Sequence, residues 1–255
     1  MKVKETIWRV VGITGVSVLL LSMISFIDKR EVGYRVDDIE VDIENTYENF
    51  FIDEEDVMSL ILENKGDTVL GDAYGRVSLK EIERRVESHS FVKDAQVFRD
   101  LNGHLVVKAT QNKPIARIIA DNGKQAYLGE EGDILPVSSK YTARVLVLSG
   151  SYMNELTARE SIEGNEYDQK LYDLIEYISE DKFWNMQIAQ LVVGKNGKVV
   201  MIPQVGDQKL EFGYAENFKS KFKRLEIFFK EIMPTKGWNT YSRVNVEYKD
   251  QLICD

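Results

Sequence analysis

The feature that most constrains this chain is an uncharged run of eighteen residues, Val10–Ile27. A helix of this length is about 27 Å long, close to the ~30 Å hydrocarbon core of a bilayer. Eleven of its residues are Val, Leu, Ile or Phe, and at roughly −0.3 to −0.6 kcal/mol each they favour insertion by about 3–6 kcal/mol. A buried core helix and a cleaved signal peptide are the alternatives, but the run has no polar stripe and no A-x-A-like cleavage site. We therefore predict a transmembrane signal anchor over residues 10–27.

The charges on either side of the run predict its orientation. Three basic residues and one acidic residue precede it, whereas the four charges directly after it cancel. The positive-inside tendency places the basic end in the cytoplasm. We expect a cytoplasmic tail of residues 1–9, one span of the cytoplasmic (inner) membrane, and a polar linker of residues 28–35 that leads to periplasmic domains.

The part of the chain beyond the tail is acidic and has the composition of a folded protein. It carries 30 of the 33 basic residues and 41 of the 42 acidic ones, a formal charge of −11. Such a charge argues against binding to nucleic acid or to an anionic membrane surface. The single cysteine, Cys254, rules out an intrachain disulfide. The fold must therefore depend on hydrophobic cores, and the 228 residues after the span suffice for two domains.

Residues 36–114 show the pattern of one small domain of helices and strands. Apolar residues alternate with acids over 39–44, as in a half-buried strand. Two short amphipathic helices follow, and the second begins at the capping-box pattern Ser78–Glu81. Two strands joined by the turn Asn102-Gly103 complete the unit, and Pro114 should end it because proline cannot donate to a central ladder.

The order strand, helix, helix, strand, strand resembles a POTRA domain, and its position after a single span resembles the bacterial cell-division family FtsQ (DivIB). The resemblance implies an α+β fold with a POTRA domain over residues 36–114 and a strand-rich FtsQ-type β domain with helices over 115–255. One departure lies at the exit of the first domain. Where many members have a Glu-Arg pair, this chain has Gln111-Asn112, so it lacks the charges on which a contact at that exit would depend.

The C-terminal half continues the resemblance. The stretch 126–136, in which an acidic-glycine turn follows Tyr127-Leu128, resembles a hairpin of the family. The stretch 141–150 resembles the next strand in members from Bacteroidetes-type bacteria. We expect a loop over 151–166, a helix from Tyr167, and strands over 188–193, 198–202 and 209–212.

A second apolar helical stripe runs from Phe218 to Ile232 and should end at Pro234. Lysine and arginine occupy much of its other side. A solvated basic face is the favoured interpretation, and an anionic ligand site is the alternative. Alternation at Val244, Val246 and Tyr248 predicts the last strand.

We find no set of residues that supports catalysis, a metal or a cofactor. The two histidines, His89 and His104, lie at a helix end and a hairpin turn, and Cys254 has no second cysteine. Nucleophile elbows, zinc-protease motifs and phosphate-binding glycine loops are missing. Acidic clusters fit helix caps and turns, and they lack the donor spacing of a calcium loop. The sequence therefore predicts a protein that is not an enzyme.

Three functions remain open. The resemblance implies a non-enzymatic scaffold of the divisome at the septum, which binds the paired proteins FtsB and FtsL outside the membrane and links them to septal cell-wall synthesis. Other divisome membrane proteins could bind through the POTRA domain. A membrane-anchored envelope hydrolase is disfavoured by the missing catalytic set. The third function is a POTRA-containing envelope assembly or secretion factor that binds client strands, although such proteins usually have several POTRA units or a barrel.

We predict that the partner binds by strand addition at the last strand, since no later segment is expected to cover it. The resemblance implies the same edge, and it matches Tyr248 to an aromatic position of the family. An edge blunted by its charged residues, or a strand paired inside the sheet, is the alternative. The candidate partner-binding residues are Arg243, Val244, Asn245, Val246, Glu247, Tyr248 and Leu252.

Overall fold

The computed structural model describes residues 14–19, 22, 35–44, 49–62, 69–71, 73, 77–100, 102–238 and 240–255. The chain divides into two compact units, residues 1–45 with 52–111 and residues 46–51 with 112–255. Of the predicted span, the described residues 14–19 and 22 are helical. Among all described residues, no helix is both long enough and apolar enough to cross a membrane. The predicted tail and most of the predicted linker lie outside the described residues.

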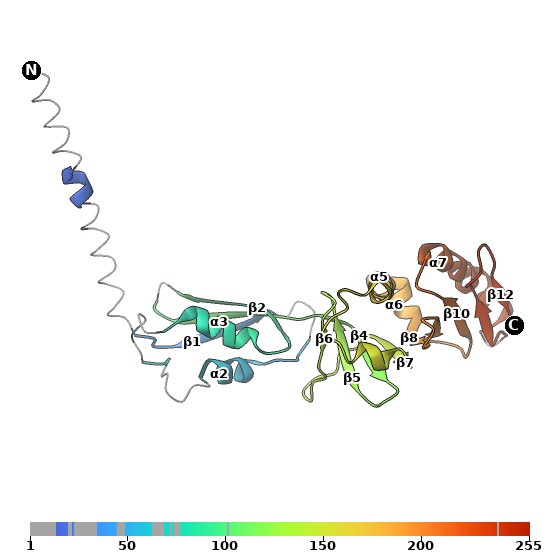
Figure 1. The fold of residues 1–255 in the computed structure, drawn as a ribbon, viewed down its shortest axis with the longest axis horizontal. Helices are drawn as coiled ribbons and strands as arrows, with labels where there is room; N and C mark the ends of the chain where they lie inside the picture. Colours follow the sequence, from blue (N-terminus) through green and yellow to red (C-terminus); the bar gives the residue numbers. More distant parts are fainter. Residues whose placement is uncertain are drawn as a thin grey trace, which may run out of the picture. The chain divides into compact units, whose positions relative to one another are not determined.

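The first unit is a three-stranded sheet with two helices (Figure 1). The strand order is β1-β3-β2, with β1 parallel and β2 antiparallel to the central strand β3. The helices and strands follow the predicted order, and their bounds are β1 Ile39–Glu44, α2 Glu54–Leu62, α3 Leu79–Glu87, β2 Val92–Arg99 and β3 Leu105–Gln111.

Both helices pack on one face of this sheet. Val57 and Ile61 of α2 and Ile82 and Val86 of α3 are buried in one cluster with the inward side chains of the strands. The other face carries polar side chains in register, because alternate residues of a strand point to opposite faces. The sequence pattern of a half-buried sheet is therefore confirmed.

Helix α3 begins as predicted, but only half of the capping box forms. The Ser78 hydroxyl accepts a hydrogen bond from the Glu81 amide at 3.3 Å. The Glu81 carboxylate does not reach back to the cap, since it binds Arg84 at 2.7 Å and Arg85 at 3.1 Å. These two arginines, first Arg84 and then Arg85, lower the pKa of Glu81 to about 2.

The second unit is built on a nine-stranded sheet in the order β12-β11-β10-β9-β8-β7-β4-β5-β6. Pro114 does not end the first unit. It is the first residue of β4, a strand inside the second sheet, and a proline is tolerated there because the first residue of a strand need not donate an N–H. The strand bounds are β4 Pro114–Ala120, β5 Gln125–Gly129, β6 Ile134–Leu135, β7 Leu146–Gly150, β8 Ile188–Val193, β9 Val199–Pro203, β10 Lys209–Gly213, β11 Arg243–Asn245 and β12 Ile253–Cys254.

One row of paired residues crosses seven of these strands and forms the floor of the core. Each member pairs with the next on the neighbouring strand, in the order β4, β7, β8, β9, β10, β11 and β12. The members are Ile118, Leu148, Leu191, Met201, Leu210, Val244 and Cys254. All but Cys254 are fully buried, at 0 % exposure. The apolar side chains of the helices pack into the same cluster, and their bounds are α4 Met153–Leu156, α5 Glu166–Glu180, α6 Lys182–Gln187, α7 Phe218–Ile227 and α8 Met233–Lys236.

Two segments differ from the sequence prediction. The strand expected over 141–150 is limited to β7, and the loop expected over 151–166 contains the short helix α4. Met153 and Leu156 of α4 are buried in the core of the second unit. Four residues are too few for a helical period to be recognised against the polar residues around them.

The helical stripe also continues past the point where we expected it to end. A π-helical segment, η1 Phe228–Ile232, follows α7, and Pro234 lies in the first turn of α8. Proline lacks an N–H and its ring crowds the preceding turn, and the first turn of a helix tolerates both. The helical path ends at Gly237, whose φ of 97° is unfavourable for other residues.

Candidate protein-binding edge

The predicted last strand lies inside the sheet and not at its edge. Strand β11 pairs in parallel with β10 on one side and antiparallel with β12 on the other, with Val244 opposite Cys254 and Asn245 opposite Ile253. The expectation that no later segment covers this strand is therefore wrong. The chain reverses after Glu247 through a turn that contains Asp250 at a φ of 55°, and aspartate tolerates this left-handed conformation better than most residues.

The edge is formed by β12. The Asp255 amide donates to the Arg243 carbonyl at 2.9 Å, and the Arg243 amide donates to the Asp255 carbonyl at 3.1 Å. Because hydrogen-bonding directions alternate along a strand, the main-chain groups of Cys254 point away from β11. They are the groups that another extended chain could pair with.

The seven predicted site residues fall into two classes. Val244 and Val246 are fully buried in the core, and Asn245 is only 6 % exposed. Leu252 is partly buried against the same core. These four support the edge. The other three are more accessible: Arg243 is exposed, Glu247 is half-buried, and the side chain of Tyr248 is 55 % exposed.

Polar contacts hold β11 against its neighbours. Asn245 donates to Glu211 at 2.6 Å and accepts from the Glu247 amide at 2.9 Å. Arg243 forms ion pairs with Asp255 at 2.5 Å and with Glu211 at 3.4 Å. Asp255 is the main cause of a raised pKa at Arg243. Asn245 is therefore a structural residue, and we expect its substitution to destabilise the sheet.

Glu247 is held from two sides. Its carboxylate lies 2.6 Å from the ammonium group of Lys198. Gly213 stands beside it at a φ of 74°, and a Cβ at that position would lie only 2.6 Å from Glu247 Cγ. Only glycine at this position leaves room for the Glu247 side chain without strain.

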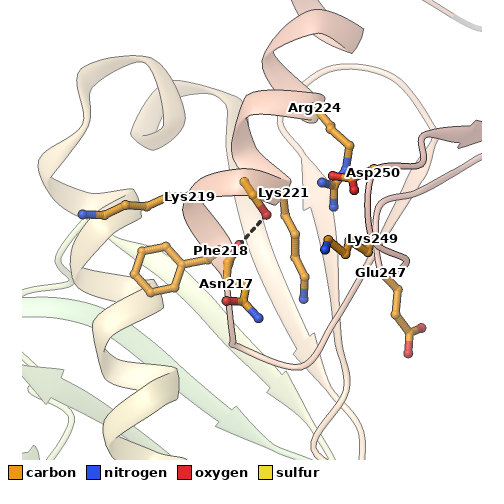
Figure 2. A pocket seen from close by; sticks show the side chains of 9 residues that line it. Asn217, Phe218, Lys219, Lys221, Arg224, Glu247, Lys249 and Asp250 are labelled. Carbon is orange, nitrogen blue, oxygen red and sulfur yellow. Dashed lines mark hydrogen bonds between the residues drawn. The ribbon is translucent and has the colours of Figure 1, made fainter.

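A pocket of about 790 Å³ lies beside the hairpin, between the first turns of α7 and the turn after β11 (Figure 2). We call it the basic pocket, and it is lined by Asn217, Phe218, Lys219, Ser220, Lys221, Arg224, Glu247, Lys249 and Asp250. Four of these residues are basic and two are acidic, and Glu247 is neutralised by Lys198. The pocket is thus locally positive in an acidic protein and suits an anionic group such as a carboxylate.

Lys219 and Lys223 of α7 are exposed, as a solvated basic face predicts, but Lys221 and Arg224 are less solvated than the sequence suggested. Lys221 is only 7 % exposed, and its ammonium group donates to the Tyr214 carbonyl at 2.7 Å and lies 4.7 Å from the centre of the Phe212 ring. Burial lowers its pKa. Arg224 donates to the Val246 carbonyl at 2.8 Å. The sequence could not indicate the pocket, because it joins a helix to a turn 25 residues later and no periodicity connects them.

The part of the chain that the structure describes contains no group of three or more His, Cys, Asp or Glu side chains that could hold a metal. The most buried carboxylate, Asp168, is paired with Arg159 and accepts a hydrogen bond from the Tyr152 hydroxyl at 2.5 Å. Burial raises the pKa of Tyr152, and it also raises the pKa of the Cys254 thiol. These are features of packing, because a nucleophilic cysteine requires a lowered pKa.

Family models match both units. Residues 113–255 match the model described as FtsQ/DivIB, C-terminal related, and residues 34–110 match a POTRA-like domain. The first match covers more than half of the chain. The chain belongs to the FtsQ/DivIB family.

The family assignment confirms the resemblance seen in the sequence, and the α+β fold agrees with it. No curated protein sequence matches the chain. FtsQ/DivIB proteins form a non-catalytic scaffold family that is septal and membrane-associated. Family membership therefore suggests a cell-division scaffold that acts through protein–protein interactions in the divisome.

Proposed function

We propose that this protein is a single-pass scaffold of the bacterial divisome, with a cytoplasmic N-terminus and two periplasmic domains. It binds the FtsB–FtsL pair outside the cytoplasmic membrane and links the pair to septal cell-wall synthesis. The observation that carries this proposal is the edge strand β12, which directs the main-chain groups of Cys254 away from the sheet. Family membership supports the choice of partner class.

We propose that the partner adds an extended segment to β12. The amide and carbonyl of Cys254 supply main-chain hydrogen bonds, and exposed Tyr248 supplies apolar contact area. The basic pocket favours a partner segment with acidic side chains near the added strand. Main-chain pairing makes binding tolerant of side-chain changes on β12, so a test must remove a main-chain group.

A pair of proline variants supplies this test. In the full-length protein in detergent, Cys254→Pro removes the outward N–H and should weaken binding of the FtsB–FtsL pair by about a hundredfold, as expected for the loss of main-chain bonds and a clash of the ring. Cys254→Ala keeps the N–H and should leave the affinity nearly unchanged. Ile253→Pro removes an N–H that faces β11 and should lower the melting temperature.

Circular dichroism distinguishes a lost interface from a lost fold. A folded Cys254→Pro variant that binds the pair normally would place the interface elsewhere. The cellular function has a separate test, because a fluorescent fusion should form a ring at mid-cell. An even envelope signal would favour the assembly or secretion factor instead.

A further inference from the structure

Strand β2 is the last strand on one side of the first sheet. The Asp100 amide donates to the His104 carbonyl at 3.0 Å, directly after the strand. By alternation, Gln96 and Phe98 exchange hydrogen bonds with β3, and the amides of Ala95, Val97 and Arg99 point outward. The amides of Ala95 and Val97 are the donors in the middle of the strand that an added strand would use.

The two central outward amides, those of Ala95 and Val97, are already occupied by side chains of α3. The Val97 amide donates to the Glu83 carboxylate at 3.0 Å, and the Ala95 amide donates to the Glu87 carboxylate at 3.5 Å. Residues four apart lie on one face of a helix. The two glutamates therefore reach the same side of β2. The earlier glutamate, Glu83, binds the later amide, that of Val97, and Glu87 binds the amide of Ala95.

We propose that Glu83 and Glu87 form a carboxylate cap that closes the β2 edge against strand addition. An incoming strand would have to displace two charged acceptors, and hydrogen bonds to charged groups are stronger than those between neutral amides. The chain most often available to an uncapped edge is another copy of the same protein, since two identical edges can pair about a two-fold axis. The cap thus keeps the POTRA-like unit from joining a second copy through β2.

The cap does not depend on the proposed function, because it concerns a different sheet and no partner protein. It also bears on the client-strand alternative. A unit that receives client strands at β2 would need this edge open, and here the outward donors in the middle of the strand are taken by its own helix.

Amide hydrogen exchange tests the contact in the full-length protein. Glu83→Ala should accelerate exchange of the Val97 amide by about tenfold, because a paired donor becomes solvent-exposed. Glu83→Gln keeps an acceptor oxygen and should show a smaller change. The Phe98 amide, which faces β3, should not change in either variant. Equal exchange at Val97 in all three proteins would overturn the proposal.

Sedimentation of the Glu83→Ala/Glu87→Ala double variant tests the consequence. With the cap removed, the protein should form concentration-dependent dimers in detergent, and the parent should not. Glu40→Ala is the matched control, since it removes one exposed carboxylate of the same unit from β1. A folded double variant that stays in the parent's oligomeric state at every concentration would overturn the proposal, as would dimers formed equally by the control.

Discussion

Strand β2 of the POTRA-like unit and strand β12 of the C-terminal unit both end a sheet, but their outward main-chain groups have different surroundings. The outward amides of Ala95 and Val97 in β2 donate to two glutamates of α3. In the part of the chain that the structure describes, no such side chain is bonded to the main chain of Cys254 in β12. The eight-residue edge strand β2 therefore carries its own protection, whereas the two-residue edge strand β12 remains available.

The two sheets have four edge strands, β1, β2, β6 and β12, and the difference between β2 and β12 shows how one edge can be closed while another stays open. Edge strands attract other chains without regard to sequence, so specificity requires that unwanted edges be blocked. The carboxylates of Glu83 and Glu87 close the β2 edge, so its amides are no longer free to bind another strand. Substitutions in α3 should test what holds the closed edge β2, and substitutions around β11 should test what holds the open edge β12.

The largest effect should come from the helix that carries the cap. Ile82 is 2 % exposed in the core of the first unit, so Ile82→Ala should lower the free energy of unfolding by about 2–5 kcal/mol. The loosened helix should also raise exchange at the Val97 amide. Chemical denaturation measures the first effect. Lys80→Ala, at an exposed position of the same helix, should leave stability nearly unchanged, and equal stability of all three proteins would show that α3 does not hold this face.

The support behind the open edge should be the next most sensitive. Asn245→Ala removes a buried donor and acceptor between β10 and β11 and should cost about 1–3 kcal/mol. Tyr248→Ala, at an exposed position, should preserve stability and weaken partner binding. Thermal unfolding and a binding titration separate the two results. A stable Asn245→Ala variant would mean that β11 does not need this contact.

A smaller effect should follow from the cap of helix α3. Ser78→Ala removes the hydroxyl that accepts from the Glu81 amide and should lower stability by about 1 kcal/mol. Ser78→Asp keeps an acceptor and should restore it. The contact would be unimportant if Ser78→Ala and Ser78→Asp unfolded at the same denaturant concentration.

The smallest effect should be a pH dependence of the folding stability of the first unit, which carries the closed edge β2. The pKa of Glu81 is lowered to about 2, so its ion pairs stabilise the folded state at neutral pH. This stabilisation should diminish as the pH falls below the ordinary value of 4.5 and should be lost near pH 2. The group is exposed, so salt should weaken the effect further. Glu81→Gln should remove that part of the pH profile, and a profile identical to the parent's would exclude this origin.

Much of the fold could be predicted from the sequence, because its elements carry periodic patterns. The half-buried strand β1, the helix α3 and the strand β8 lie where alternation and capping predict them. Strand β12 could not be predicted, since two residues have no period. Its pairing with β11 also depends on a left-handed residue, Asp250, which a sequence does not reveal.

The functional edges show the same division. From the sequence we predicted that the partner binds at the last strand, which corresponds to β11. The edge is β12 instead, because the reversal of the chain after Glu247 has no sequence signal. The carboxylate cap had no sequence signal either, since glutamates four apart occur on most exposed helix faces. Only the placement of α3 beside β2 relates Glu83 to Val97.

The geometry of the carboxylate cap also limits how far such protection can extend. Four residues of helix advance by about 6.0 Å, while two residues of strand advance by about 6.7 Å. Each further pair therefore falls out of step by roughly 0.7 Å, so a straight helix stays aligned with only a few amides. The next position toward the start of the helix is Leu79, whose side chain has no acceptor. Carboxylates on one helix can therefore cap only the amides in the middle of a strand, and a longer edge would need acceptors from a second element.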